Sequence, residues 1–496
     1  MITADGLKFR PIIGLEIHVQ LRTQTKLYCS CPVQFGAAPN SLVCPTCMGL
    51  PGALPVLNRL AIDLAVRAGL ALNCTIAEET HWDRKNYYYP DLPKNYQISQ
   101  YDQPLACNGY FELPFKGRIR RIRISRAHLE EDAGKNLHDP AGHTGVDLNR
   151  AGTPLLEIVT APDLHNADEA REFAVQIQRL LRYLGLSHAN MQRGELRFEP
   201  NINLAIMQNG QEVRTPIVEV KNLNSFRALH GAISYEVQRQ VEQWSATGET
   251  AAMGNKYNRG WDDIRGVTIP QREKEEAHDY RFLPEPDLVP LLTDRAWVAG
   301  LKQDLPELPI CRCERLVSEY KVTPRSAPAL VDDRATADLL DDAAAAGGHK
   351  PTLARHFLGI WTHLAHERGI TIARLGISPG RLAELANLVH KGRINATAAA
   401  RLAAALLDNY ESPTALATRL NLLQTQDQTQ IDTWVDQVLA DNAQAVQDAI
   451  RKPKKLEAAR GFLAGQVMKI SCGQADPGLV RSTIEQRLDQ AEHAEE

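Results

Sequence analysis

Two closely spaced cysteine pairs constrain this chain more than any other feature of its sequence. Cys29 and Cys31 form a C-x-C pair, and Cys44 and Cys47 form a C-x-x-C pair twelve residues further on. If the loop between them folds back, four thiolates meet in the tetrahedral arrangement that zinc prefers. The alternative is four thiols buried in a core, but the turn-forming Pro45 favours zinc. Four cysteines leave no open position on the ion, so we expect a structural site rather than a catalytic one.

The segment just before these cysteines alternates between apolar and polar residues with the period of a β-strand. Its polar side carries Glu16 and His18, where a solvated strand more often carries lysine, threonine or serine. Its apolar side is formed by Ile13, Leu15, Ile17, Val19 and Leu21. We therefore predict a half-buried strand whose second face presents a carboxylate and an imidazole.

Later segments repeat this design of an apolar back and a charged front. GELRFEPNINLAI (residues 194–206) and EVKNLNSF (residues 219–226) both alternate in this way. In the run LLEIV, Glu157 interrupts four apolar residues, where a carboxylate is costly unless it is paired or bound to a metal. Glu157 is therefore a better site candidate than the acidic triplet at residues 130–132, because such a triplet usually lies in solvent.

Packed side by side, these strands would form a sheet with one face on the core and one carboxylate-lined face open to a large substrate. Converging carboxylates suit Mg²⁺, which is held by a few protein oxygens together with substrate phosphates. The sequence has no GxxxxGK[ST] or GxGxxG run, so an ATP site would not be of either loop type.

Composition places the chain among globular proteins with more than one domain. A length of 496 residues exceeds one ordinary core, and hydrophobic and charged residues make up 44% and 23%. There is no run of about 18 apolar residues and no secretory signal layout, so we expect the protein in the cytoplasm. A net charge of −4 argues against indiscriminate coating of nucleic acid. Basic runs at residues 118–126 and 451–455 can each be a local RNA contact or a solvated face.

The texture of the sequence changes twice along the chain. Residues 1–296 are rich in Gly, Pro, Asn and aromatic residues in short alternating runs, which predicts mostly β structure with interspersed helices. Residues 297–411 are dominated by Ala, Leu and Arg at helical spacing. A polar, Gln-rich stretch then opens a last helical block, residues 412–496. We therefore predict three domains with these bounds.

One irregular segment, HWDRKNYYYPDLPKNYQISQYDQP (residues 81–104), has two interpretations. Lys85 and Lys94 could meet phosphates while the tyrosines stack on a nucleotide. Composition alone slightly favours a tyrosine-rich loop packed over the sheet. Cys311 and Cys313 lack a second pair, so we treat them as ordinary residues.

With these residues in place, the chain resembles a known family: GatB, the tRNA-activating component of the aspartyl/glutamyl-tRNA(Asn/Gln) amidotransferase. The resemblance runs almost end to end and in the same order. The motifs that carry it are GLEIHVQL, CPTCMGLPGALPVLN, RKNYYYPDLPKNYQISQYD, HLEEDAGK, DLNRAGTPLLEIVT, VKNLNSF, REKEEAHDYRFLPEPDL and FLAGQVMK.

The resemblance implies an α+β fold: a catalytic domain built on an antiparallel-sheet cradle, then a helical domain, then a small YqeY-like helical tail that grips tRNA. It implies a complex with an amidase (GatA), which releases ammonia from glutamine, and with a small third component (GatC). GatB would use ATP and Mg²⁺ to phosphorylate the side-chain carboxylate of glutamate or aspartate misacylated on tRNA. Ammonia arriving through a channel would then displace the phosphate.

The resemblance also assigns residues. Glu16, His18, Glu131 and Glu157 match the catalytic and Mg²⁺-site positions, and Lys85 and Tyr87 match polar residues where ammonia enters. The four cysteines match the family's zinc site. In the tail, the basic run offers tRNA contacts through Lys452, Lys454 and Lys455.

The chain departs from the family near residue 191, where it reads MQRGELRFEPNINLAI. Arg193, Glu195 and Phe198 are altered, and Glu199 stands where the family has the shorter Asp. These changes keep a second hypothesis open: a zinc-containing tRNA-binding or assembly protein that has lost the activation chemistry. A ligase acting on a free metabolite fits less well, because a small substrate needs no basic helical appendage. The sequence leaves open whether Glu-tRNA(Gln), Asp-tRNA(Asn) or both are substrates.

Overall fold

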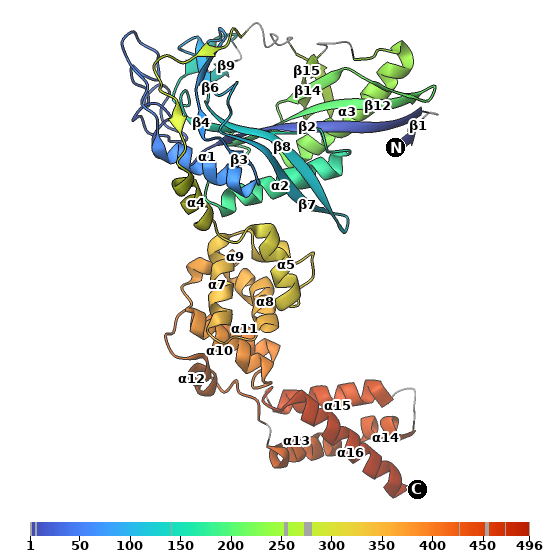
Figure 1. Ribbon diagram of the computed structural model, residues 1–496. Helices are drawn as coiled ribbons and strands as arrows, with labels where there is room; N and C mark the ends of the chain where they lie inside the picture. The colour runs from blue at the N-terminus through green and yellow to red at the C-terminus, as the bar shows by residue number, and fades with distance from the viewer. Residues whose placement is uncertain are drawn as a thin grey trace. The chain divides into compact units, whose positions relative to one another are not determined.

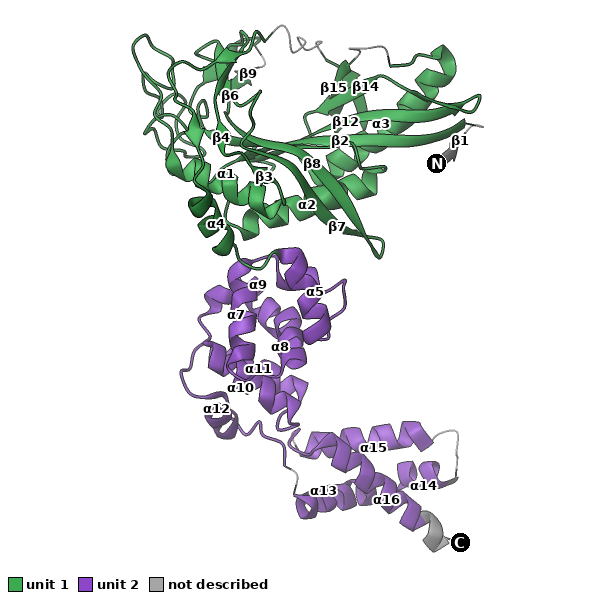
Figure 2. Cartoon of the chain, viewed as in Figure 1, with its two compact units in different colours: residues 1–308 green, residues 309–496 purple. Residues whose placement is uncertain are grey.

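The computed structural model describes residues 2–4, 7–139, 141–251, 256–271, 280–425, 427–451, 456–471 and 473–495. The chain divides into two compact units, Met1–Leu308 and Pro309–Glu496, which Figure 2 colours separately. The domain bounds at residues 296 and 411 stay predictions. No helix in the described ranges is long and apolar enough to cross a membrane.

A large twisted sheet forms the first unit (Figure 1). Within the described residues it has eleven strands in the order β16-β15-β14-β12-β2-β11-β8-β7-β3, with β1 paired to β2 and β13 paired to β12. The bounds are β1 Ile2–Ala4, β2 Leu7–Gln20, β3 Thr75–Ile76, β7 Ala106–Phe115, β8 Arg118–Glu131, β11 Pro154–Thr160, β12 Leu196–Gln208, β13 Gln211–Arg214, β14 Ile217–Lys221, β15 Lys256–Asp262 and β16 Val267–Pro270.

Short strands form three smaller sheets beside the large one. They are β4 Glu79–Thr80 with β18 Leu291–Leu292; β5 Asp83–Asn86 with β6 Tyr96–Ser99 and β17 Leu283–Pro284; and β9 Lys135–His138 with β10 Thr144–Asp147. The segment that contains β5 and β6 is the tyrosine-rich stretch of the sequence, and β6 packs against β8.

The predicted α+β class is confirmed, with one difference in strand direction. The pairs of the large sheet are antiparallel except for β14 and β15, which run parallel. A parallel pair needs a crossover, which α3 (Phe226–Thr247) provides between these two strands. The Ser225 side chain caps α3 by accepting a hydrogen bond from the Ala228 amide.

The core lies on the apolar side of β2. Ile17 and Val19 are fully buried there, as are Leu156 of β11 and Leu129 of β8. The helices α1 (Arg59–Ala71) and α2 (Ala167–Tyr183) lie on the same side of the sheet (Figure 1), and α2 packs against α3 and β7. A further helix, α4 (Arg295–Gln303), packs on α1. The opposite side of β2 is thus left to its polar residues.

The second unit is helical throughout its described part. Its elements are α5 Pro309–Glu319, α6 Ala327–Leu330, α7 Arg334–Ala345, α8 Lys350–His356, the π-helix η1 Phe357–Trp361, α9 Thr362–Glu367, the 3-10 helix η2 Ile372–Leu375, α10 Pro379–His390, α11 Ala396–Leu406, α12 Pro413–Arg419, α13 Gln428–Asp441, α14 Ala443–Arg451, α15 Leu456–Ile470 and α16 Pro477–Glu495. The last four helices share a core of their own, centred on Val435, Leu463 and Val480.

Candidate functional site

Strand register brings distant polar residues into one row across the centre of the large sheet. His18 of β2 lies opposite Arg197 of β12 on one side and Glu157 of β11 on the other. Glu157 in turn lies opposite His128 of β8. Because side chains alternate along a strand, these residues share the face that also carries Glu16. Four strands therefore contribute to one site.

Three of these side chains form the imidazole cluster, which we define as His18, Glu130 and Glu157. Its potential ligand atoms all lie within 4.8 Å of one another. His18 Nε2 is 3.5 Å from Glu157 Oε2 and 3.9 Å from Glu130 Oε1. His128 flanks the cluster, with its Nε2 3.8 Å from Glu157 Oε2. The carboxylates are buried, so their charge needs a nearby cation.

Burial and mutual charge separate the pKa values of this cluster. Burial lowers the pKa of His128 to about 4, so this ring is neutral at pH 7. Burial also opposes the charged form of His18, but the hydrogen bond and charge of Glu157 outweigh it and raise its pKa to about 9. Burial and the Glu157 charge raise the pKa of Glu130 to about 7. Glu157 has a pKa well below its usual value, because His128, His18 and Lys85 outweigh its burial.

The residues of the imidazole cluster fit a divalent cation. One imidazole and two carboxylates are hard to moderately hard donors, and Mg²⁺ keeps part of its water and phosphate shell when bound by so few protein ligands. The Nδ1 atoms of His18 and His128 are buried without a hydrogen-bond partner among the described residues. Buried polar atoms in that state are expected where a ligand or ion completes a site.

Glu131, which the family motif points to, lies on the other side of β8. It shares that side with the buried Leu129, and its carboxylate pairs with Lys94 and accepts a hydrogen bond from the Ile98 amide at 3.0 Å. Glu130 is the carboxylate that lies beside His18. Its position could have been found from the sequence, because His128 and Glu130 are two residues apart and so share a strand face. The role of Glu131 in a metal site stays a prediction.

Glu16 belongs to a second cluster, which we call the carboxylate trio: Glu16, Glu199 and Glu219, with ligand atoms within 4.8 Å of one another. Glu199 lies directly opposite Glu16 in the β2–β12 register. Lys221 and Lys256 approach the trio, at 3.0 Å from Glu199 and 2.7 Å from Glu219. Glu199, one of the residues that depart from the family, is therefore a direct neighbour of Glu16.

Lys85 and Tyr87 lie beside the imidazole cluster in the tyrosine-rich segment. The Lys85 ammonium is 4.8 Å from the ring centroid of Tyr280 and 6.0 Å from that of Tyr87. Its charge acts on Glu157, Glu130 and His128. Burial raises the pKa of the Tyr87 phenol, which therefore stays protonated. A cation and a phenol thus border the cluster, as polar lining would.

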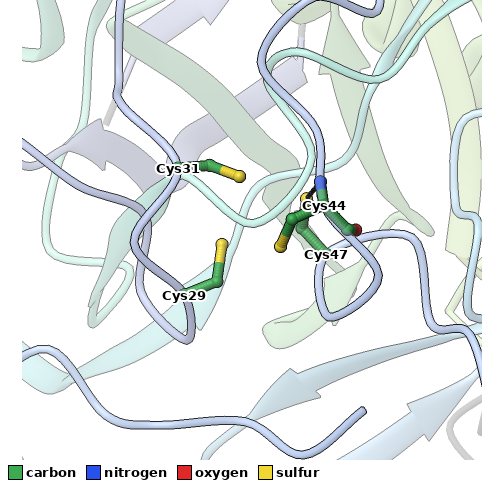
Figure 3. A group of neighbouring side chains, drawn as sticks. All are labelled: Cys29, Cys31, Cys44 and Cys47. Carbon is green, nitrogen blue, oxygen red and sulfur yellow. Dashed lines mark hydrogen bonds between the residues drawn. The ribbon is translucent and has the colours of Figure 1, made fainter.

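The four cysteines meet as their spacing predicts. Their Sγ atoms lie within 4.8 Å of one another, and Figure 3 shows Cys29 and Cys31 facing the loop that carries Cys44 and Cys47. A tetrahedral zinc with Zn–S bonds of ~2.3 Å needs sulfur atoms about 3.8 Å apart, so the thiols fit this ion. Hydrogen bonding from Cys29, opposed by burial, lowers the pKa of Cys47 to about 4. The buried Lys26 ammonium lies 3.5 Å from the same sulfur.

Of the two basic runs, only the first lies among the described residues. Arg120 pairs with Glu169 at 3.1 Å, and Arg123 pairs with Asp163 at 2.7 Å. These ion pairs favour the solvated-face interpretation of residues 118–126. Lys452, Lys454 and Lys455 fall outside the described residues, so their contact with tRNA stays a prediction.

The altered stretch near residue 193 lies at the start of β12. Arg193 is exposed and stacks 5.0 Å above the ring of Phe35, while Glu195 accepts a hydrogen bond from the Asn190 amide at 3.1 Å. Phe198 is buried in the core. Of the four altered residues, Glu199 is the one that the structure brings into a carboxylate cluster.

Comparison with known proteins agrees with this architecture. The family model described as "GatB/GatE catalytic domain" matches residues 11–299, and the model described as "GatB domain" matches residues 338–488. Among curated proteins, one from Carboxydothermus hydrogenoformans is 41% identical over 485 residues, covering 97% of this chain and 99% of the relative. One from Persephonella marina is 41% identical over 483 residues, covering 97% and 100%.

Both relatives carry the name of the GatB polypeptide of the aspartyl/glutamyl-tRNA(Asn/Gln) amidotransferase, as does a protein from Thermoanaerobacter pseudethanolicus, which is 40% identical over 482 residues and covers 97% and 100%. Identity of this level across nearly the whole length accompanies the same order of sheet and helical parts. The chain belongs to the GatB family of the aspartyl/glutamyl-tRNA(Asn/Gln) amidotransferase.

Proposed function

We propose that this protein activates the side-chain carboxylate of glutamate on tRNA(Gln), aspartate on tRNA(Asn), or both, with ATP and Mg²⁺, and converts it to the amide with ammonia. The observation that carries the proposal is the imidazole cluster at the centre of the polar sheet face, in a chain of the GatB family. This reaction places the protein among glutamine-hydrolysing carbon–nitrogen ligases.

The chemistry explains why ATP is required. A carboxylate is a poor electrophile, so a substrate carboxylate oxygen attacks the γ-phosphorus, ADP leaves and an acyl phosphate forms. Ammonia then attacks the acyl carbon, the carbon–oxygen bond to phosphate breaks, and inorganic phosphate and a proton are released. Such a transfer depends on positioning and charge neutralisation rather than on a covalent enzyme intermediate.

In this scheme, His18, Glu130 and Glu157 would hold Mg²⁺, which when bound neutralises the charge of the phosphates. Glu157 has a pKa well below its usual value and so stays anionic. Glu16, one alternation along β2, would border the phosphate site. We place ammonia entry at Lys85 and Tyr87, with the Lys94–Glu131 pair on the other side of β8.

The partners follow from the reaction. Ammonia would come from the amidase GatA, and the small protein GatC would complete a heterotrimer in the cytoplasm. Mischarged tRNA(Gln) or tRNA(Asn) would be held partly by the tail, including Lys452, Lys454 and Lys455. Zinc at Cys29, Cys31, Cys44 and Cys47 would order the loop beside β2.

A reconstitution tests this proposal. The protein, its amidase and small partners, glutamine, ATP and Mg²⁺ would be mixed with glutamate-charged and aspartate-charged tRNA, and amide formation followed. We expect conversion of at least one substrate and its loss in Glu157→Gln, with tRNA binding nearly unchanged. Glu112→Gln is the matched control, because this exposed carboxylate lies on β7 of the same sheet.

Normal ATP hydrolysis by Glu157→Gln would contradict the site assignment. If neither tRNA were converted while both were bound, the tRNA-binding or assembly hypothesis would replace the enzyme.

A further inference from the structure

The carboxylate trio has a charge problem that the rest of the protein must solve. Glu16, Glu199 and Glu219 come from three neighbouring strands, β2, β12 and β14, and their ligand atoms lie within 4.8 Å of one another. Glu219 is fully buried. Three like charges so close together, one of them away from water, require cations nearby.

Two lysines supply those cations from within the chain. Lys221 Nζ is 3.0 Å from Glu199 Oε2 and 3.1 Å from Glu219 Oε1. Lys256 Nζ is 2.7 Å from Glu219 Oε2 and 3.7 Å from Glu16 Oε1. Each oxygen of Glu219 thus faces a different ammonium. Two of the three edges of the trio are bridged by lysine, and its formal charge falls from −3 to −1.

A divalent cation would compete for the same oxygens. Mg²⁺ must approach a carboxylate oxygen to ~2.1 Å in a nearly octahedral shell, and it would repel an ammonium held at the same atom. The pair formed by Lys256 is the more accessible barrier, because its side chain is 39% exposed and that of Lys221 is 26% exposed.

The surroundings could otherwise accommodate an ion. Asn201 lies opposite Glu219 in the β12–β14 register, and Asn258 lies opposite Glu219 on β15. Asn201 Oδ1 and Asn258 Oδ1 are buried without a hydrogen-bond partner among the described residues, and Asn258 is only 5% exposed. Amide and carboxylate oxygens are the donors that Mg²⁺ and Mn²⁺ accept.

We propose that Lys221 and Lys256 act as fixed cations in the carboxylate trio, so that the sheet binds one divalent cation, at the imidazole cluster, and excludes a second from Glu16, Glu199 and Glu219. The proposal rests on the metal site of the proposed function. It makes Lys256 a positioning residue, because its ammonium holds Glu16 and Glu219 in place where a second metal ion would otherwise do so.

Counting bound Mn²⁺ tests the proposal without measuring activity. Mn²⁺ would be titrated into the full-length protein with its cysteine site loaded with Zn²⁺, and free Mn²⁺ followed by electron paramagnetic resonance. We expect one ion in the unaltered protein and two in Lys256→Gln. Lys256→Arg, which keeps the charge, and Lys302→Gln, which removes an exposed lysine of α4, should each bind one.

Removing the first site identifies where each ion lies. Glu157→Gln should bind none, and the double variant Glu157→Gln, Lys256→Gln should bind one. If Lys256→Gln is too unstable to titrate, Lys221→Gln opens another edge of the trio, and Mn²⁺ should then raise the melting temperature of that variant more than that of the unaltered protein.

The outcomes separate the two proposals. Two ions in the unaltered protein, or one ion in both it and Lys256→Gln, would overturn the role of the lysines. No Mn²⁺ bound by the unaltered protein would instead contradict the metal site of the proposed function, and the fixed-cation proposal with it.

Discussion

At the scale of single residues, two adjacent glutamates have opposite surroundings. Glu130 lies beside His18, with burial raising its pKa to about 7, whereas Glu131 pairs with Lys94 on the core side of β8. The family motif HLEEDAGK contains both and cannot distinguish them by itself. The alternation of β8 does so, because only Glu130 is in phase with His128.

We therefore predict that Glu130→Gln weakens Mn²⁺ binding at least about tenfold, equivalent to ~1.4 kcal/mol, because it removes an anionic ligand. Glu131→Gln should change this affinity by less than about threefold, since its carboxylate faces Lys94. Both affinities can be measured by calorimetric titration of the full-length protein. The reverse order of effects would contradict the assignment of Glu130.

The sequence anticipated the polar face of β2 but not its partners. The alternation from Ile13 to Leu21 predicted the strand, and the structure confirms it as part of β2. The pairing of Glu16 with Glu199, or of His18 with Glu157, depends on the order and register of strands that lie more than a hundred residues apart in the chain. A local period of two fixes a face but carries no information about which strand lies alongside.

At the scale of elements, the loop of residues 22–58 depends on its cysteines. It has few buried apolar residues, and much of it is exposed, including Phe35 and Leu54. In contrast, the parallel pairing of β14 with β15 could not be read from strand patterns, because a parallel and an antiparallel neighbour present the same alternation.

We expect one zinc ion per chain, and we expect Cys47→Ala to abolish its binding. Without zinc, amides of residues 22–58 should exchange with solvent at least about tenfold faster, because a metal that binds only the folded loop stabilises it. Elemental analysis and hydrogen–deuterium exchange measure the two effects. Cys107→Ala, which lies outside the cluster, is the matched control and should keep its zinc. Equal protection with and without zinc would contradict a structural role for the ion.

At the scale of the whole molecule, the last four helices have a core of their own, built around Val435, Leu463 and Val480. Helix α12 packs against α10 and α11 instead, with Leu416 and Ala417 fully buried. The change of texture in the sequence located the helical region, but helices of neighbouring domains have the same apolar spacing. Which core each helix joins is therefore decided by tertiary packing.

This assignment directs a truncation. Ending the chain after Thr425 removes the last four helices and leaves α12 in place. We expect tRNA affinity to fall at least about tenfold (~1.4 kcal/mol), with turnover at saturating tRNA reduced by less than about threefold. Affinity and turnover would be measured for the assembled heterotrimer. Equal affinity for the truncated and complete complexes would exclude the tail from tRNA recognition.

The long pairing of β2 with β12 also has a genetic consequence. The two strands are in continuous register from Val19 opposite Leu196 to Phe9 opposite Ile206. One extra codon before Glu16 would shift the parity of every later residue of β2 and turn its acid–base groups toward the core. The same insertion at the turn of Asn209 and Gly210 would leave parity untouched. The centre of this sheet thus behaves as a second reading frame, with a period of two residues.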